Sequence, residues 1–249
     1  MFNKKSFLFL LVLFLSVIQL IFGQSKDMRV YTSDGNVIRA SISEIDSINF
    51  QMTSTVTDYD GNVYSIIKIG DQWWMAENLK VTHYRNGYPI PIVTDQTAWS
   101  NLTTGAYCEY DNNSANVITY GRLYNWYAVN DSCNIAPSGW HVPSDAEWQT
   151  LINYLGEASA GGKLKEAGTT HWNSPNDGAT NESGFSALPG GYRYDDGSFG
   201  WLGDHAYFWS STEFAGDYAW HRLLLHYDAN VYRNPSNKLH GFSVRLVRD

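Results

Sequence analysis

The chain has 249 residues, of which 17 are basic and 25 acidic, giving a formal net charge of −8. This acidic balance excludes the basic footprint that nucleic-acid-binding proteins carry, and it does not suit an anionic membrane surface. The aromatic content of 15% and the 21 glycines argue against disorder, because disordered segments are poor in aromatic residues. The composition therefore predicts a folded chain with many loops held down by aromatic side chains.

The N-terminus carries the pattern of a secretory signal peptide. Lys4 and Lys5 precede a largely apolar run over residues 7–22 that ends at Gly23, and a basic head, an apolar middle and a small residue define such a signal. We expect residues 1–24 to be cleaved, leaving a mature chain that is secreted or held at the cell surface. The alternative is an uncleaved anchor, since a membrane span needs about 20 apolar residues. No later segment approaches a span.

Residues 25–52 predict a small N-terminal β-hairpin unit. Two β-prone runs, 29–32 and 37–42, flank the Asp-Gly turn signal within residues 33–36, which is a strong hairpin pattern. The unit is too short to form its own core. The polar residues 53–55 are the expected linker, and residues 56–249 are the expected main domain.

The main domain begins with another Asp-Gly hairpin signal at residues 57–64, whose second strand continues to residue 69. Residues 80–118 are rich in turn signals, and residues 168–204 read as loop. The C-terminal part is β-rich, with strands expected at 206–212, 218–225 and 241–247. Strands at both ends with helices between them predict an α+β domain whose first and last strands pair.

The sequence predicts one helix with a capping signal at each end. Ser144 is the expected N-cap and Glu147 lies three residues further on, which is a capping box. Apolar residues follow at helical spacing from Trp148 to Leu155, and Gly156 supplies the left-handed terminal residue. Residues 159–167 predict a shorter second helix weakened by two glycines.

The two cysteines, Cys108 and Cys133, are expected to form one disulfide, because an even count in an exported chain favours pairing. Two free buried thiols are the alternative.

Two loops carry candidate binding residues. Residues 176–182 gather oxygen ligands, with Asp177, Asn181 and Glu182 as candidate calcium ligands; a polar turn that caps its own backbone is the alternative. In the loop 197–205, Trp201, Asp204 and His205 are candidates for stacking on a sugar ring or entering a protein partner. The alternative there is a loop pinned by its own aromatic side chains. Trp140, Trp148, Trp209 and Trp220 are expected in the core.

The motifs of the main domain closely resemble the Fibrobacter succinogenes major paralogous domain, a family of secreted and surface bacterial proteins without an established biochemical role. The resemblance covers residues 56–249 and rests on residues 60–64, 72–79, 120–129, 139–148, 183–193 and 208–212. More distantly, residues 141–148, 190–193 and 241–245 resemble formylglycine-generating-enzyme-like domains. That likeness implies a C-type-lectin-like fold with two helices, small antiparallel sheets and long loops that form a ligand surface.

The same resemblance bears on activity. Formylglycine-generating enzymes use a cysteine pair near the C-terminal end, whereas no cysteine follows Cys133 here. No Gly-x-Ser-x-Gly elbow, His-Glu-x-x-His helix or phosphate-binding glycine loop is present. The sequence therefore favours a non-catalytic extracellular module that recognises a glycan or a protein. An enzyme using unrecognised residues of the same loop surface and a structural surface component are the alternatives.

Overall fold

The computed structural model describes residues 27–31, 37–41 and 55–249, and the chain divides into two units, Met1–Met52 and Thr53–Asp249. The expected signal peptide lies outside the described residues. In the first unit, β1 (Asp27–Tyr31) pairs antiparallel with β2 (Val37–Ser41). This confirms the predicted pairing of the two strands, while the turn between them lies outside the described part. Within the described ranges, no helix has the length and apolar character needed to cross a membrane.

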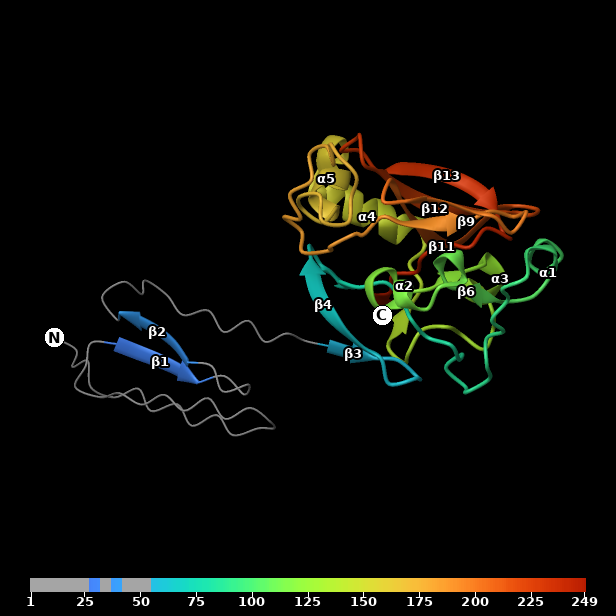
Figure 1. The fold of residues 1–249 in the computed structure, drawn as a ribbon, viewed down its shortest axis with the longest axis horizontal. Coiled ribbons are helices and arrows are strands. Elements are labelled where there is room, and N and C mark those ends of the chain that lie inside the picture. The colour runs from blue at the N-terminus through green and yellow to red at the C-terminus, as the bar shows by residue number, and fades with distance from the viewer. Residues whose placement is uncertain (1–26, 32–36, 42–54) are drawn as a thin grey trace. The chain divides into compact units, whose positions relative to one another are not determined.

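The second unit is α+β (Figure 1), as predicted. One five-stranded sheet has the order β10 (Phe199–Leu202), β9 (Gly190–Arg193), β11 (His205–Ala215), β12 (Tyr218–Leu225) and β13 (Tyr232–Asn237). The other has the order β3 (Thr55–Thr57), β4 (Val63–Ile69), β5 (Gln72–Met75), β14 (Val247–Arg248) and β8 (Trp140–His141). A two-stranded pair joins β6 (Tyr107–Cys108) to β7 (Leu123–Tyr124).

The helices are few and short. Figure 1 shows α4 and α5 together beside the sheet that contains β11 to β13, and α1, α2 and α3 on the other side of it. They are α1 (Gln96–Ser100), α2 (Ala115–Tyr120), α3 (Trp126–Val129), α4 (Asp145–Leu155) and α5 (Ala160–Leu164), with 3-10 turns at Tyr110–Asn112 and Glu157–Ser159.

Helix α4 forms as its local sequence predicts. The Ser144 hydroxyl accepts a hydrogen bond from the Glu147 backbone N–H, and the Glu147 carboxylate accepts one from the Ser144 backbone N–H at 2.7 Å. These two bonds satisfy backbone groups that have no partner inside the helix. Gly156 ends the helix at φ 88°, a conformation that favours glycine. The second predicted helix is present but shorter, as α5 with a 3-10 turn before it.

The β11–β12 hairpin separates two hydrophobic cores, because alternate strand residues point to opposite faces. Phe208 and Leu224 pack with Trp148 and Trp74 against α4. Trp209 and its neighbours pack on the opposite face around Phe242. Trp140, Trp148 and Trp209 are buried as predicted.

Three expectations need correction. Trp220 is only half-buried, and the Arg233 guanidinium lies 3.4 Å from the centroid of its ring. The loop expected at 168–204 contains β9 and β10, which pair across the Asp-Gly turn at 196–197. The strand expected at 241–247 is not one ladder: residues 241–243 each form a single bridge with a different partner, and only Val247–Arg248 is a strand. That strand joins β5 to β8, so the two ends of the main domain do meet.

The expected disulfide is also absent from the structure. Both cysteines are free. Cys108 is fully buried in a small cluster with Trp99 and Leu123, whereas Cys133 is half-buried against the large cluster around Phe242. The two side chains therefore belong to different packing environments, and burial raises the pKa of the Cys108 thiol to about 12.

Candidate functional site

Three adjacent strands bring five ring side chains together at one surface, which we call the aromatic site. Tyr192 and Tyr194 come from β9 and the residue after it, Trp201 from β10, and His205 and Tyr207 from β11. Tyr192 and Tyr194 lie two residues apart, as do His205 and Tyr207, so each pair projects from the same face of its strand. The ring centroids of Tyr192 lie 4.2 Å from Tyr194 and 4.5 Å from Tyr207.

Trp201 is the exposed member of the aromatic site. It keeps 47% of its surface accessible, although its indole is fixed at two places. Nε1–H donates to the Tyr194 hydroxyl at 2.7 Å, and the ring stacks on His205 with centroids 4.5 Å apart and planes 9° apart. One side of the indole is thus held by protein while much of the rest meets water.

The backbone of Trp201 is unusual for a bulky residue. Its φ is +67°, in the left-handed region where a residue with a large side chain is a rare outlier. Its carbonyl accepts the Asp204 N–H at 3.1 Å, closing a tight turn through Gly203. Strain of this kind costs about 1–3 kcal/mol and clusters at functional sites. The structure therefore holds a strained tryptophan in a conformation that exposes it.

His205 and Tyr207 are held in defined states beneath the indole. His205 Nδ1 lies 3.1 Å from the Tyr207 hydroxyl. Burial lowers the pKa of His205, and the nearby Asp204 only partly opposes this effect. Burial likewise raises the pKa of Tyr207 above its usual value. At neutral pH both the imidazole and the phenol beneath the indole are therefore uncharged.

Asp204 lies at the edge of the aromatic site. Its Oδ1 accepts a hydrogen bond from Asn173 Nδ2 at 2.9 Å and lies 3.7 Å from His226 Nε2. The ring of His226 in turn meets the exposed Tyr227 edge-on at 5.1 Å. The three residues expected from the sequence, Trp201, Asp204 and His205, are thus brought together, with polar donors and acceptors beside the rings.

The calcium ligands expected from the sequence are not assembled. Asn181 uses both atoms of its amide on Ser186, and Glu182 faces Lys163 at 3.8 Å. The Asp177 carbonyl accepts a hydrogen bond from the buried Lys165 ammonium at 2.8 Å. Across the described residues no cluster of acidic, His and Cys side chains suited to a metal ion is found. The Asn181 amide is thus engaged within its own loop, and the Lys165 ammonium lies against the Asp177 carbonyl.

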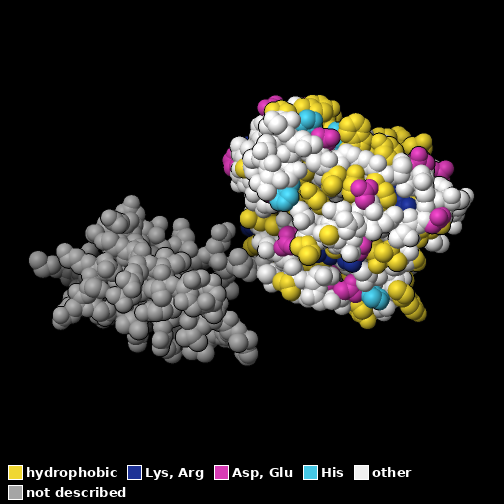
Figure 2. Space-filling model, in the orientation of Figure 1, with side chains coloured by type: hydrophobic (Ala, Val, Ile, Leu, Met, Phe, Trp, Pro, Cys, Tyr) yellow, Lys and Arg dark blue, Asp and Glu magenta, His cyan; other side chains and the backbone are white. Residues whose placement is uncertain are grey.

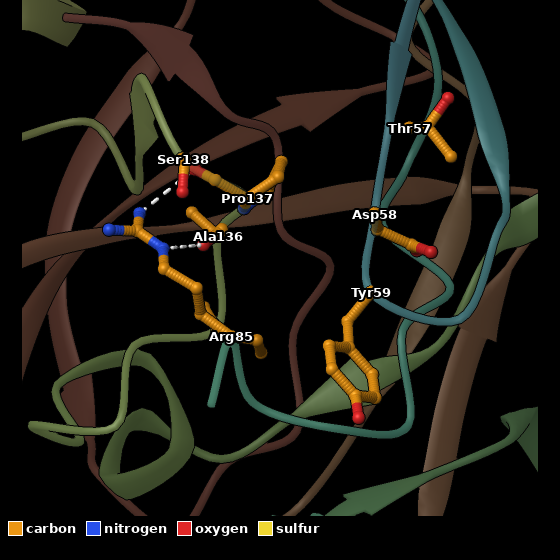
Figure 3. A pocket seen from close by; sticks show the side chains of 8 residues that line it. Thr57, Asp58, Tyr59, Arg85, Ala136, Pro137 and Ser138 are labelled. Carbon is orange, nitrogen blue, oxygen red and sulfur yellow. Dashed lines mark hydrogen bonds between the residues drawn. The ribbon is translucent and has the colours of Figure 1, made fainter. Parts of the chain in front are cut away.

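A cavity of about 200 Å³ lies between residues 57–59, in the turn from β3 to β4, and residues 135–138 (Figure 3), and its polar groups already have hydrogen-bond partners. The Arg85 guanidinium donates to the carbonyls of Ala136, Pro137 and Trp140. On the other wall, the Asp58 carboxylate accepts bonds from the backbone of residues 60 and 62 and from the Tyr64 hydroxyl. The Arg85 guanidinium and the Asp58 carboxylate are therefore both engaged by hydrogen bonds within the protein.

Sequence reasoning missed Tyr192, Tyr194 and Tyr207. The period of two along a strand could have found them, because it places residues 192 and 194 on one side of their strand and residues 205 and 207 on one side of theirs. These two sides lie next to each other because β9 and β11 pair in parallel at Gly191 and Ala206. No local sequence pattern predicts that pairing.

The family model of the Fibrobacter succinogenes major domain matches residues 67–248. No curated protein and no solved structure matches the chain. The family match covers more than half of the sequence, including every residue of the aromatic site, and the chain belongs to the Fibrobacter succinogenes major domain family.

Proposed function

We propose that this protein is an exported, non-catalytic recognition module that binds glycans at the aromatic site. The observation that carries the proposal is Trp201, a half-exposed indole at a positive φ, fixed by Tyr194 and His205. Sugar rings present C–H faces that pack on aromatic rings, and a ring fixed in advance loses little entropy when it binds. Asp204, Asn173 and the tyrosine hydroxyls supply hydrogen-bond partners for sugar hydroxyls at the edge.

The charge around the aromatic site favours neutral glycans. The segments 171–178, 194–209 and 223–232, which contain the aromatic site except for Tyr192, hold five aspartates and no lysine or arginine. Arg193, which follows Tyr192, is fully buried. In Figure 2, lysine and arginine are also sparse on the visible face of the main domain, where apolar side chains appear in several patches. An acidic surface repels uronate-rich or sulfated polysaccharides. A neutral chain of hexoses or pentoses fits best.

The proposed role agrees with two expectations from the sequence. The signal pattern of residues 1–24 favours export, where bacterial glycans are encountered. The motif likeness to C-type-lectin-like domains favours a fold in which long loops form the ligand surface. Both are inferences from the sequence, and both support the proposal.

Binding to immobilised neutral and acidic polysaccharides tests this function. The wild type should retain neutral glycans, and Trp201→Ala and Asp204→Ala should weaken retention. Tyr154→Ala is the matched control, because Tyr154 is an exposed aromatic residue on α4 (66% accessible) outside the aromatic site. Unchanged retention by Trp201→Ala would place the binding surface elsewhere, and capture of a protein in place of any glycan would refute the glycan assignment.

A further inference from the structure

A cavity of about 340 Å³ lies apart from the residues of the aromatic site. Its walls come from the segment after β5, from α2, from the residues around His171, and from Ser186, Leu188 and Arg245. The volume is at the lower end of the ~300–1,000 Å³ range typical of small-molecule sites. We call it the side cavity.

Two hydrogen-bonded pairs of side chains are held in place at the side cavity. The Lys80 ammonium lies 3.1 Å from the Glu77 carboxylate, which also accepts the Ser65 N–H at 3.1 Å. Across the cavity, His171 Nδ1 lies 2.9 Å from both carboxylate oxygens of Glu166. These side chains keep between 20% and 38% of their surface accessible, so they are fixed and still reachable by a ligand.

The floor of the side cavity is rigid. Arg245 is 1% exposed and donates to Asn78 Oδ1 at 2.6 Å and to the carbonyls of residues 75, 185 and 186. Asn78 in turn donates to the Tyr120 carbonyl at 2.8 Å. His171 meets the edge of the Tyr120 ring at 5.9 Å and 83°. The lining is therefore preformed, which lowers the entropic cost of binding.

Hydrogen-bonding capacity remains at both pairs. Lys80 has three N–H groups, and one partner is seen for it among the described residues. His171 Nε2 has no hydrogen-bond partner within the described part of the chain, and its Nδ1 is engaged by Glu166. The carboxylates of Glu77 and Glu166 retain lone pairs that accept further bonds. The cavity thus offers donors beside acceptors at two fixed points.

The lining also has an apolar wall and no net charge from its acidic and basic residues. Ile118 on α2 is 82% exposed at the cavity, so a ligand there would cover apolar surface that now faces water. Two carboxylates, Glu77 and Glu166, balance Lys80 and Arg245. An isolated anion would meet the carboxylates and an isolated cation would meet the basic groups, so neither class gains a clear advantage.

We propose that the side cavity binds a neutral sugar or polyol of monosaccharide size. Each sugar hydroxyl both donates and accepts a hydrogen bond, which matches the alternation of Lys80 with Glu77 and of His171 with Glu166. The C–H face of the ring packs on Ile118. This site is separate from the aromatic site and does not depend on glycan binding there.

Titration of the full chain by calorimetry and by ligand-observed NMR tests the proposal, with D-glucose, D-galactose, D-xylose and myo-inositol as neutral probes. D-glucuronate and D-glucosamine serve as the charged probes. At least one neutral probe should bind saturably. Lys80→Met and His171→Phe should each weaken it about 10-fold, since each removes a hydrogen bond at a charged or polarised group. Lys163→Met is the matched control, because Lys163 forms a partly exposed ion pair outside the cavity.

Thermal melting of each variant identifies any that fails to fold, and the two variants act on opposite walls so that one can replace the other. The proposal would be overturned if no neutral probe bound, if both folded variants kept the affinity of the wild type, or if a charged probe bound more tightly than the neutral ones. A probe held in the side cavity is weakened by Lys80→Met and His171→Phe, whereas a probe held at the aromatic site is weakened by Trp201→Ala. Loss of binding in Trp201→Ala with full binding in the other two variants would overturn the proposal, so failure of the side cavity and failure of the proposed function give different results.

Discussion

Trp148→Ala should be among the most destabilising single changes in the main domain. Trp148 is 1% exposed, and its ring centroid lies 4.8 Å from Trp74, 5.7 Å from Phe208 and 5.9 Å from Phe185. Its Nε1–H also donates to the Trp209 carbonyl at 3.3 Å. Truncation removes these contacts and opens a cavity between α4 and the sheet.

The expected loss is about 3–5 kcal/mol, the usual range for a buried tryptophan changed to alanine. The upper half of this range is expected, because each aromatic pair adds about 0.5–1.5 kcal/mol beyond the area it buries. Since a domain of this size is stable by about 5–15 kcal/mol, the variant should lose a large part of its stability.

Urea denaturation followed by circular dichroism measures the change, with Trp201→Ala as the matched control. The chemical change is the same, but Trp201 is 47% exposed, so its loss should cost only about 1–2 kcal/mol. Equal midpoints for the two variants, or an unchanged midpoint for Trp148→Ala, would refute the packing of α4 on the sheet.

Three further predictions concern single residues. Ser144→Ala should cost about 1 kcal/mol of stability by loss of the N-cap, whereas Ser159→Ala should cost less because Ser159 makes no side-chain cap bond to α5; equal losses in chemical denaturation would contradict the capping box. Burial lowers the pKa of His141, but hydrogen bonds with Asp249 at 2.6 Å and Glu147 at 2.8 Å outweigh burial and raise it overall. The stabilisation from these bonds is therefore complete below the unfolded pKa of about 6.5 and is lost as pH rises through the higher folded pKa. The difference in melting temperature between the wild type and His141→Gln should therefore narrow from pH 6 to pH 8.5. A constant difference would argue against the two hydrogen bonds of His141. Lys165→Met leaves three carbonyls, of residues 177, 225 and 228, without the ammonium donor that lies 2.8–2.9 Å away. The free energy of unfolding should fall by at least about 3 kcal/mol, at ~1 kcal/mol for each acceptor left without a partner. A fall under 1 kcal/mol in the same denaturation assay would show that water replaces the ammonium.

The sequence predicted the parts of the fold that depend on neighbouring residues. The capping box at Ser144 and the Asp-Gly hairpin before β4 are determined within a few residues of chain, and both appear in the structure. The segment 241–247 was harder, because its residues bridge Arg193, Tyr124 and Phe208 in turn. Such pairing depends on elements far apart in the chain.

The same distinction applies to the aromatic site. Trp201 could be selected as an aromatic residue in a glycine-rich loop, and Asp204 and His205 as its polar neighbours. Its positive φ and its hydrogen bond to Tyr194 could not be predicted, since they follow from how β9, β10 and β11 meet. The contacts of the candidate calcium ligands could not be predicted for a related reason: Lys165, twelve residues before Asp177, places its ammonium on the same loop.

The most direct test of glycan recognition is a binding isotherm of the full chain on a neutral polysaccharide selected from a glycan array, measured beside Trp201→Ala. The wild type should bind saturably, and the variant should lose at least about 10-fold in affinity, as expected when a stacking aromatic anchor is removed. The melting temperature should confirm that the variant remains folded. Equal affinity in the two proteins, or an array on which the wild type binds only acidic glycans, would contradict the account.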